Sequence, residues 1–249
     1  MTENKRITIL GVPVDLIDKE AAMARFEELF PQPGVTAVYT PNSEIVENAS
    51  HDPALKELIN SAELIIPDGI GLVYASRFVG HPLKERVTGI DFLESIIAYL
   101  ADHGKSIFFF GSKPGVAEKA AEKIREKYPA LRVAGTHDGY FKPEEESAIV
   151  EQINESGADF LCVALGAPKQ EKFIYDHKEE LKVHGAIGVG GSLDVWSGDL
   201  KRAPEFYQKH GLEWLYRFIQ QPGRIGRVMK LPVFMLKVIF QGRSQEGLS

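Results

Sequence analysis

Short apolar runs alternate with helix-length segments along most of the chain, and this alternation constrains the fold more than any other feature. The runs are rich in β-branched and aromatic residues and lie at residues 6–12, 35–39, 64–66, 106–110, 131–135, 160–165 and 185–189. Segments with helical character separate them, at residues 19–30, 45–49, 54–61, 70–78, 92–101, 116–127, 143–156 and 172–181. Strands that alternate with helices form a mainly parallel sheet covered on both faces. The sequence therefore predicts an α/β, Rossmann-like core.

Composition excludes several classes of protein. The chain has 249 residues, of which 44% are hydrophobic and 26% charged, as in an ordinary soluble globular protein. Its formal net charge of -6 argues against nucleic acid as a partner, because nucleic-acid-binding domains are usually basic. The single cysteine, Cys162, cannot form an internal disulfide, and the sequence has no Cys/His cluster with metal-ligand spacing. A polar start leads directly into a strand without a signal peptide, so we expect a cytoplasmic protein.

The end of the chain differs in character, and we expect an α/β core over residues 1–195 and a helical appendage over residues 196–249. No acidic residue lies between Glu213 and Glu246, whereas basic residues there are Arg217, Arg224, Arg227, Lys230, Lys237 and Arg243. The apolar run at residues 233–240 is far shorter than the roughly 20 residues that span a bilayer. It suits a helix lying in the membrane interface, where basic side chains meet anionic headgroups.

Docking of this helix on the core, or on a second copy of the chain, is the alternative. We favour the membrane interpretation because packing alone does not require so sharp an excess of positive charge. An exposed apolar tail also predicts self-association into a homo-oligomer when lipid is absent.

Polar turns are expected at one edge of the sheet. Asp68 lies in the turn Pro67-Asp68-Gly69, directly after an apolar run, although Pro-Asp-Gly is also common turn chemistry and such an Asp is often only an N-cap. Similar turns lie at residues 40–44, 166–171 and 190–194, and Gly111-Ser112 forms a further one. Glycines let the backbone approach a ligand, and helix N-termini offer N–H groups to phosphate. A nucleotide or sugar-phosphate ligand is therefore expected, but neither GxGxxG nor a P-loop occurs, so kinase-like, dehydrogenase-like and transferase functions stay open.

Considered together, the turns resemble a known family, the WecG/TagA/CpsF glycosyltransferases. The matching motifs, in order, are TPNSE (40–44), PDG (67–69), RVTGID (86–91), FFFGS (108–112), GYF (139–141), LGAPKQE (165–171), GVGGSLD (188–194), KRAP (201–204) and GLEWLYRFIQQPGRIGR (211–227). The resemblance covers residues 7–240. It implies transfer of N-acetylmannosamine from a UDP-sugar donor to polyprenyl-diphosphate-linked N-acetylglucosamine, an early step in synthesis of wall teichoic acid or a related surface polymer. It also implies an inverting, metal-independent reaction without a cofactor, by a peripheral protein on the inner membrane face.

The resemblance assigns roles to individual residues. The family's general base falls on Asp68, which with the ordinary Asp pKa of ~3.9 would be ionised at neutral pH without special tuning. It would take the proton of the acceptor hydroxyl as that hydroxyl attacks the anomeric carbon opposite the leaving UDP. Thr40 and Asn42 would hold acceptor or donor hydroxyls, and Arg86 and Gln170 would orient the donor.

Further residues would bind the nucleotide. Tyr140 and Asp194 match uridine-contacting positions, and the predicted ligand-approaching glycines are Gly111, Gly190 and Gly191. The appendage arginines that match the family are Arg217, Arg224 and Arg227. Because no metal motif is visible, we hypothesise that these arginines bind the diphosphate and close over it when the tail meets the membrane. For each, a lipid-facing or solvated charge is the alternative.

Two other functions stay open. One is the same chemistry with another UDP-sugar, an N-acetylmannosamine uronate or glucose, for capsule or exopolysaccharide. The other is a non-catalytic nucleotide-sugar-binding scaffold at the membrane. The joint presence of Asp68, Thr40, Asn42 and Gln170 argues against the scaffold.

Overall fold

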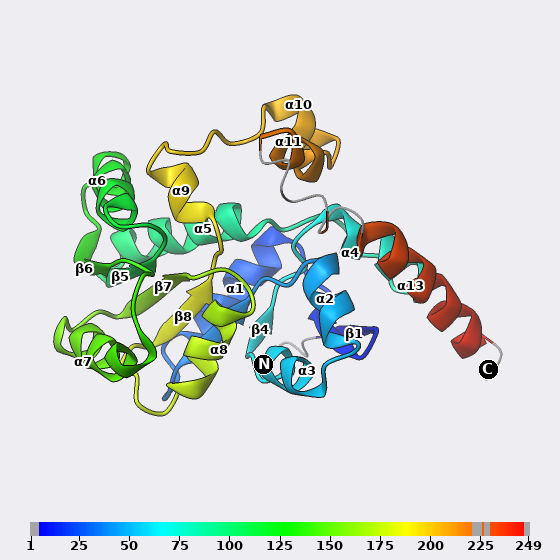
Figure 1. Ribbon diagram of the computed structural model, residues 1–249, viewed down its shortest axis with the longest axis horizontal. Helices are drawn as coiled ribbons and strands as arrows, with labels where there is room; N and C mark the ends of the chain where they lie inside the picture. Colours follow the sequence, from blue (N-terminus) through cyan, green and yellow to red (C-terminus); the bar gives the residue numbers. More distant parts are fainter. Residues whose placement is uncertain (1–4, 221–225, 227–229, 247–249) are drawn as a thin grey trace.

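The computed structural model of the protein describes residues 5–220, 226 and 230–246. At its centre is a six-stranded parallel sheet with strand order β4-β3-β8-β7-β5-β6 (Figure 1). The strands are β3 (Thr36–Tyr39), β4 (Leu64–Ile65), β5 (Ser106–Gly111), β6 (Arg132–His137), β7 (Phe160–Ala164) and β8 (Gly185–Gly188). This sheet and its flanking helices confirm the predicted α/β fold.

Helices cover both faces of the sheet. One face is packed by α1 (Lys19–Leu29), α5 (Gly89–Asp102), α6 (Val116–Lys127) and α9 (Ser192–Trp196). The other is packed by α2 (Ser43–Ala49), α3 (Pro53–Asn60), α4 (Ile70–Phe78), α7 (Glu146–Glu155) and α8 (Lys169–Asp176). A short 3₁₀ helix, Pro143–Glu145, precedes α7. Along β5, Phe108 and Phe110 face one core and Ile107 and Phe109 the other, as the two-residue period of a strand requires.

The start of the chain differs from the prediction of one strand over residues 6–12. It forms an antiparallel hairpin of β1 (Arg6–Ile9) and β2 (Val12–Asp15), which is separate from the main sheet. The two turn residues, Leu10 and Gly11, have φ values of 49° and 85°. Tight two-residue hairpin turns need positive φ at both positions, so Gly11 in the middle of the apolar run was the signal for a turn.

Three helices of the C-terminal part are described: α10 (Glu205–Lys209), α11 (Glu213–Gln220) and α13 (Lys230–Glu246). In Figure 1, α10 and α11 lie beyond one edge of the sheet, and α13 runs along α2 and α4 toward the C-terminus. Phe234 and Val238 of α13 are completely buried in the core that α2 and α4 share. The last helix is therefore docked on the core, which is the alternative that the sequence left open.

Packing also accounts for part of the positive charge of the tail. Lys230 Nζ donates to Asn48 Oδ1 at 2.5 Å, and Lys237 Nζ lies 2.6 Å from Glu47 Oε1, both partners being in α2. Two of the basic residues behind the membrane interpretation thus serve helix docking. The argument that packing does not need this charge was therefore wrong for these two lysines.

The outer side of α13 remains apolar. Val233, Leu236 and Phe240 are 46%, 58% and 65% exposed, and their spacing places them on one helical face. Within the described part of the chain, no helix is both long and apolar enough to cross a bilayer.

Candidate active site

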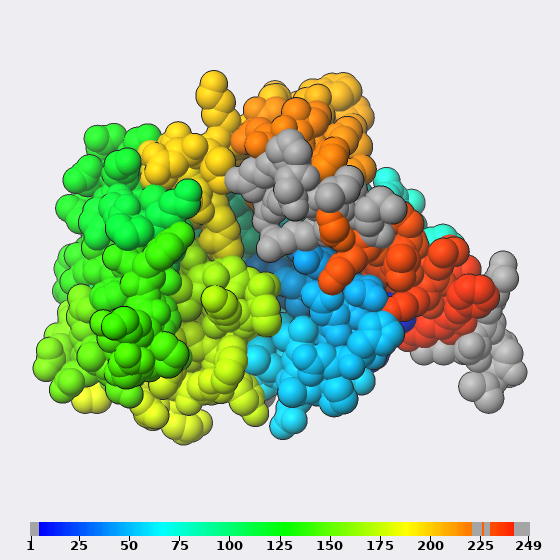
Figure 2. Space-filling view, in the orientation of Figure 1, coloured from blue at the N-terminus to red at the C-terminus, as the bar shows by residue number. Residues whose placement is uncertain are grey.

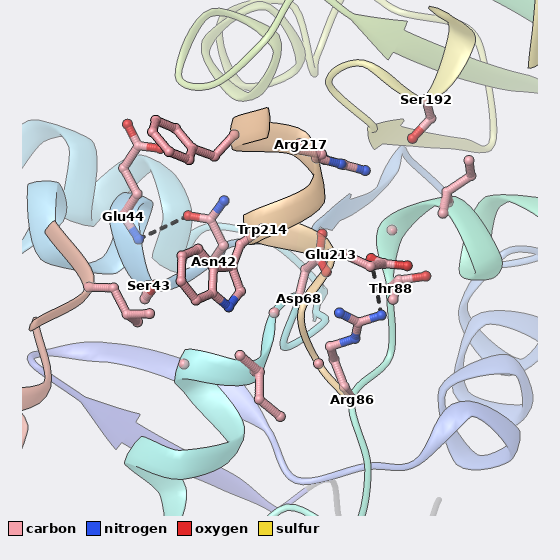
Figure 3. Close-up of a pocket in the computed structure, with 18 of the residues that line it drawn as sticks. Asn42, Ser43, Glu44, Asp68, Arg86, Thr88, Ser192, Glu213, Trp214 and Arg217 are labelled. Carbon is pink, nitrogen blue, oxygen red and sulfur yellow. Dashed lines mark hydrogen bonds and ion pairs between the residues drawn. The ribbon is translucent and has the colours of Figure 1, made fainter. Parts of the chain in front are cut away.

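A cavity of about 200 Å³ lies between the C-terminal edge of the sheet and the appendage. It is smaller than the roughly 300–1,000 Å³ typical of pockets for drug-sized ligands. The polar residues among its described lining are Asn42, Ser43, Glu44, Asp68, Arg86, Thr88, Ser192, Glu213, Trp214 and Arg217 (Figure 3). Core turns supply most of this lining, and α11 closes the remaining side.

Asp68 is placed in the cavity by the turn that links β4 to α4. Gly69 has a φ of 95°, a conformation that favours glycine, and this sharp turn lets α4 begin at Ile70. The Asp68 N–H donates to the Pro41 carbonyl at 3.1 Å, which joins this turn to the one after β3. The Gly89 N–H, in the first turn of α5, lowers the pKa of the Asp68 carboxyl. The Asp68 carboxylate thus lies at a helix N-terminus, where negative charge is favoured.

The environment of Asp68 is not that of an ordinary surface carboxyl. Burial raises its pKa, and the Glu213 carboxylate acts in the same direction. Arg217, Arg86 and the Gly89 N–H oppose this shift, but the net pKa is above the usual value. The pKa of Asp68 therefore differs from the ordinary Asp value that was assumed from the sequence. A carboxylate whose pKa is raised binds a proton more strongly, which suits a general base.

Two arginines and a second carboxylate surround Asp68. Arg86 comes from the loop before α5, and its Nη2 lies 3.1 Å from Glu213 Oε2. Glu213 and Arg217 are four residues apart on α11, so both point from one face of the helix toward the cavity (Figure 3). The structure thus brings the predicted residues Asp68, Arg86 and Arg217 together.

Asn42 also lines the cavity. Its Oδ1 caps α2 by accepting from the N–H groups of Glu44 at 2.9 Å and Ile45 at 3.1 Å. The cap fixes the side chain and leaves its amide nitrogen as the group available to a ligand. Asn42 thus combines a structural role with a position that fits hydroxyl binding.

Thr40 and Gln170 lie beneath the cavity and not in its lining. The Thr40 hydroxyl donates to the Gly188 carbonyl at 3.1 Å, which links β3 to β8. Gln170 is buried, and its Oε1 accepts from the N–H groups of Gly166 at 3.2 Å and Gly190 at 2.8 Å. Its side chain therefore fixes the positions of the turns after β7 and β8 relative to each other.

The remaining predicted residues lie at the same edge of the sheet, farther along it. Gly111 ends β5 so close to β7 that a Cβ atom would lie 2.5 Å from the Ala164 carbonyl carbon. Tyr140 is exposed after β6, and burial raises the pKa of Asp194 in α9. Gly190, with a φ of 52°, and Gly191 form the turn between β8 and α9.

A smaller cavity lies beside the larger one and contacts the turn after β8. It measures about 50 Å³ and is lined partly by Gly191, and it shares Ile90, Glu213 and Arg217 with the larger cavity. Gly191 of the second group therefore lies next to the larger cavity. Arg224 and Arg227 lie outside the described residues.

Sequence reasoning gave no role to Glu213, although the residue belongs to the motif at residues 211–227. The available signal was its position as the last acidic residue before the acid-free stretch. Trp214 also lines the cavity. In the described part of the chain, no three His, Cys, Asp or Glu side chains come together as a metal site would require.

Comparisons with known proteins match one family along most of the chain. Residues 7–247 match the model of the glycosyl transferase WecG/TagA/CpsF family. A Bacillus spizizenii protein is 36% identical over 83% of this chain and 80% of its own length. A Bacillus subtilis protein is 35% identical over 84% and 81%, and a Staphylococcus aureus protein is 34% identical over 94% and 92%. All three are named N-acetylglucosaminyldiphosphoundecaprenol N-acetyl-beta-D-mannosaminyltransferase.

Proposed function

Because the chain belongs to the WecG/TagA/CpsF family of glycosyltransferases, we propose that it transfers N-acetylmannosamine from UDP-N-acetylmannosamine to N-acetylglucosaminyl-diphosphoundecaprenol. The product would enter synthesis of wall teichoic acid or a related surface polymer. The observation that carries this proposal is the position of Asp68, in a cavity at the sheet edge that the arginine-bearing helix α11 closes.

In the proposed reaction, a hydroxyl oxygen of the acceptor sugar attacks the anomeric carbon of the donor. The bond from that carbon to the diphosphate oxygen breaks, and UDP leaves with the electron pair. Asp68 accepts the hydroxyl proton, so the attacking oxygen does not become a positively charged oxonium as its bond to the anomeric carbon forms. Attack opposite the leaving group inverts the anomeric configuration.

The negative charge that develops on UDP needs a counter-charge. Arg86 and Arg217 face the cavity, and the planar guanidinium group binds phosphate through paired hydrogen bonds. Arg224 and Arg227 would join them. This arrangement supplies the charge stabilisation that a metal ion provides in other transferases, and we therefore propose a metal-independent reaction without a cofactor.

The two groups of polar residues fit two parts of the substrates. The Asn42 amide would bind a sugar hydroxyl beside Asp68, and the turns at Gly111, Gly190 and Gly191 would bind the nucleotide with Tyr140 and Asp194. Thr40 and Gln170 support this site from below, through the Gly188, Gly166 and Gly190 backbone.

Because the proposed acceptor is attached to a lipid, the protein has to act at a membrane surface. We propose that the outer face of α13, formed by Val233, Leu236 and Phe240, enters the lipid interface on the cytoplasmic side. The buried face of the same helix keeps it docked on α2 and α4, so that the membrane is held near the cavity.

Separate incubations with UDP-N-acetylmannosamine, UDP-N-acetylglucosamine, a UDP-N-acetylmannosamine uronate and UDP-glucose test the proposal. The acceptor is a short-chain lipid-diphosphate-N-acetylglucosamine, and the product is identified by mass. We expect UDP release and one added N-acetylhexosamine with the first donor. A product with only the uronate or glucose donor would favour the alternative pathways. Nucleotide-sugar binding without any product would favour the scaffold function.

A further inference from the structure

The ion pair between Arg86 and Glu213 lies at the boundary between core and appendage. Arg86 Nη2 and Glu213 Oε2 are 3.1 Å apart, and the side chains are only 15% and 12% exposed. The other carboxylate oxygen, Glu213 Oε1, is buried and has no hydrogen-bond partner among the described residues. Figure 3 shows the pair directly beside Asp68.

Stability alone does not explain this arrangement. A buried ion pair regains its desolvation cost only when the remaining polar atoms are also satisfied, and no described residue satisfies Glu213 Oε1. Glu213 also places a second negative charge near Asp68, which raises the pKa of Asp68. A glutamine or an apolar residue at this position would avoid both costs. The carboxylate therefore fits a functional role.

An ordinary helix-terminus role does not explain it either. Glu213 is in the first turn of α11, where the helix dipole stabilises acidic side chains. Its carboxylate nevertheless points inward to the guanidinium group of Arg86, which lies in a loop far away in the sequence. Glu205 provides the contrast, since it is in the first turn of α10 and pairs at 2.8 Å with Lys209 on the exposed surface.

We propose that Glu213 is a positioning residue: its carboxylate holds Arg86 in the cavity, fixes α11 over the site, and sets the charge balance around Asp68. This inference rests on the proposed transferase function for its effect on turnover. The contact itself requires no substrate. Arg86, held in place before the donor arrives, presents its remaining N–H groups to the diphosphate without a search for the correct rotamer.

The first test measures the docking of α11 without any substrate. The chain has two tryptophans, so a Trp196→Phe background leaves Trp214, adjacent to Glu213, as the only one. We expect Glu213→Gln and Arg86→Gln each to increase acrylamide quenching of Trp214. The charge exchange Arg86→Glu with Glu213→Arg should return quenching toward the parent value. Glu205→Gln, the matched change in α10, should leave quenching unchanged.

Hydrogen exchange of residues 213–220 in the protein with Trp196 intact provides a second measurement, should the Trp196→Phe background fold poorly. Faster exchange in Glu213→Gln than in Glu205→Gln is expected. Equal quenching and equal exchange in all variants would overturn the proposed positioning.

The second test measures the effect on Asp68. In the described part of the chain, the charged groups that face Asp68 are Glu213 and Arg217 from α11 and Arg86 from the loop before α5, while Glu44 from α2 lines the same cavity. Loss of the Glu213 charge should move the acid limb of the plot of kcat against pH to lower pH. Loss of the positioning of Arg86 should reduce kcat on the order of 10- to 10²-fold. Glu205→Gln should change neither. An unmoved acid limb would overturn the charge role, whereas absence of turnover in the parent protein would instead contradict the transferase function.

Discussion

Arg217 of α11 acts on Asp68 of the β4–α4 turn across the cavity, and of the charges that lower the pKa of this carboxyl it has the largest effect. The two residues belong to different parts of the chain, the appendage and the core. The strength of the proposed base therefore depends on whether the appendage is in place. A core without its appendage would keep Asp68 but would lose Arg217 and Glu213, two of the charges that shift its pKa.

Replacement of Arg217 by Gln should raise the pKa of Asp68 further, because a positive charge that stabilises the carboxylate is lost. The base works only when ionised, so the acid limb of the kcat profile should move to higher pH. Activity on the acid side of the profile should fall and should recover as the pH rises. Arg217→Lys, which keeps the charge, should leave the limb near its parent position. An unchanged limb in Arg217→Gln would mean that Arg217 does not influence the base.

Replacement of Asp68 by Asn should lower kcat on the order of 10²- to 10⁴-fold, since the amide cannot accept the proton. Donor binding, measured by calorimetry with UDP-sugar, should persist because Asn has nearly the same shape. Asp52→Asn is a suitable control, as Asp52 caps the distant helix α3 and Asn also caps helices well. Full turnover by Asp68→Asn would reject Asp68 as the base, although it would still show that the protein is a catalyst and not a scaffold.

The sequence predicted the sheet because its strands are buried on both faces and therefore form continuous apolar runs. Phe108, Phe109 and Phe110 form such a run, and the breaks before and after it are clear. The hairpin at Leu10 and Gly11 was missed because its two short strands join into one apolar segment. A single Gly in a strand-like run is an ambiguous signal, since it also fits a bulge.

Site residues were harder to predict than strands. The edge at which the turns gather follows from the parallel sheet, and Asp68 and Asn42 lie where this rule places them. The rule does not say which side chain of a turn points into a cavity. Thr40 and Gln170 bond instead to backbone groups beneath it. The contact between Glu213 and Arg86 depends on how the appendage packs, and no local pattern encodes it.

Replacement of Gln170 by Ala should affect stability and nucleotide binding together. It leaves the part-buried Gly166 and Gly190 N–H groups without their acceptor, at a cost of up to about 1–3 kcal/mol for each. The turns after β7 and β8 should then shift, so the Kd for UDP should rise. Gln208→Ala, which removes one hydrogen bond to the Ala203 carbonyl in the appendage, should cost less stability and leave UDP binding unchanged. Parent-like binding by Gln170→Ala would show that the two turns do not hold the nucleotide.

The two apolar faces of α13 should separate folding from membrane binding. Phe234 is completely buried, so Phe234→Ala should reduce the free energy of unfolding by about 3–5 kcal/mol in denaturant titrations. Val233 and Leu236 are largely exposed, so the double change of both to Ser should alter stability little. It should, however, weaken cosedimentation with phosphatidylglycerol vesicles, because interfacial binding scales with the apolar area inserted. If the double variant bound vesicles as the parent does, the outer face of α13 would not be the membrane contact. A loss of stability as large as that of Phe234→Ala would instead indicate that this face is packed against protein in solution, as in a homo-oligomer.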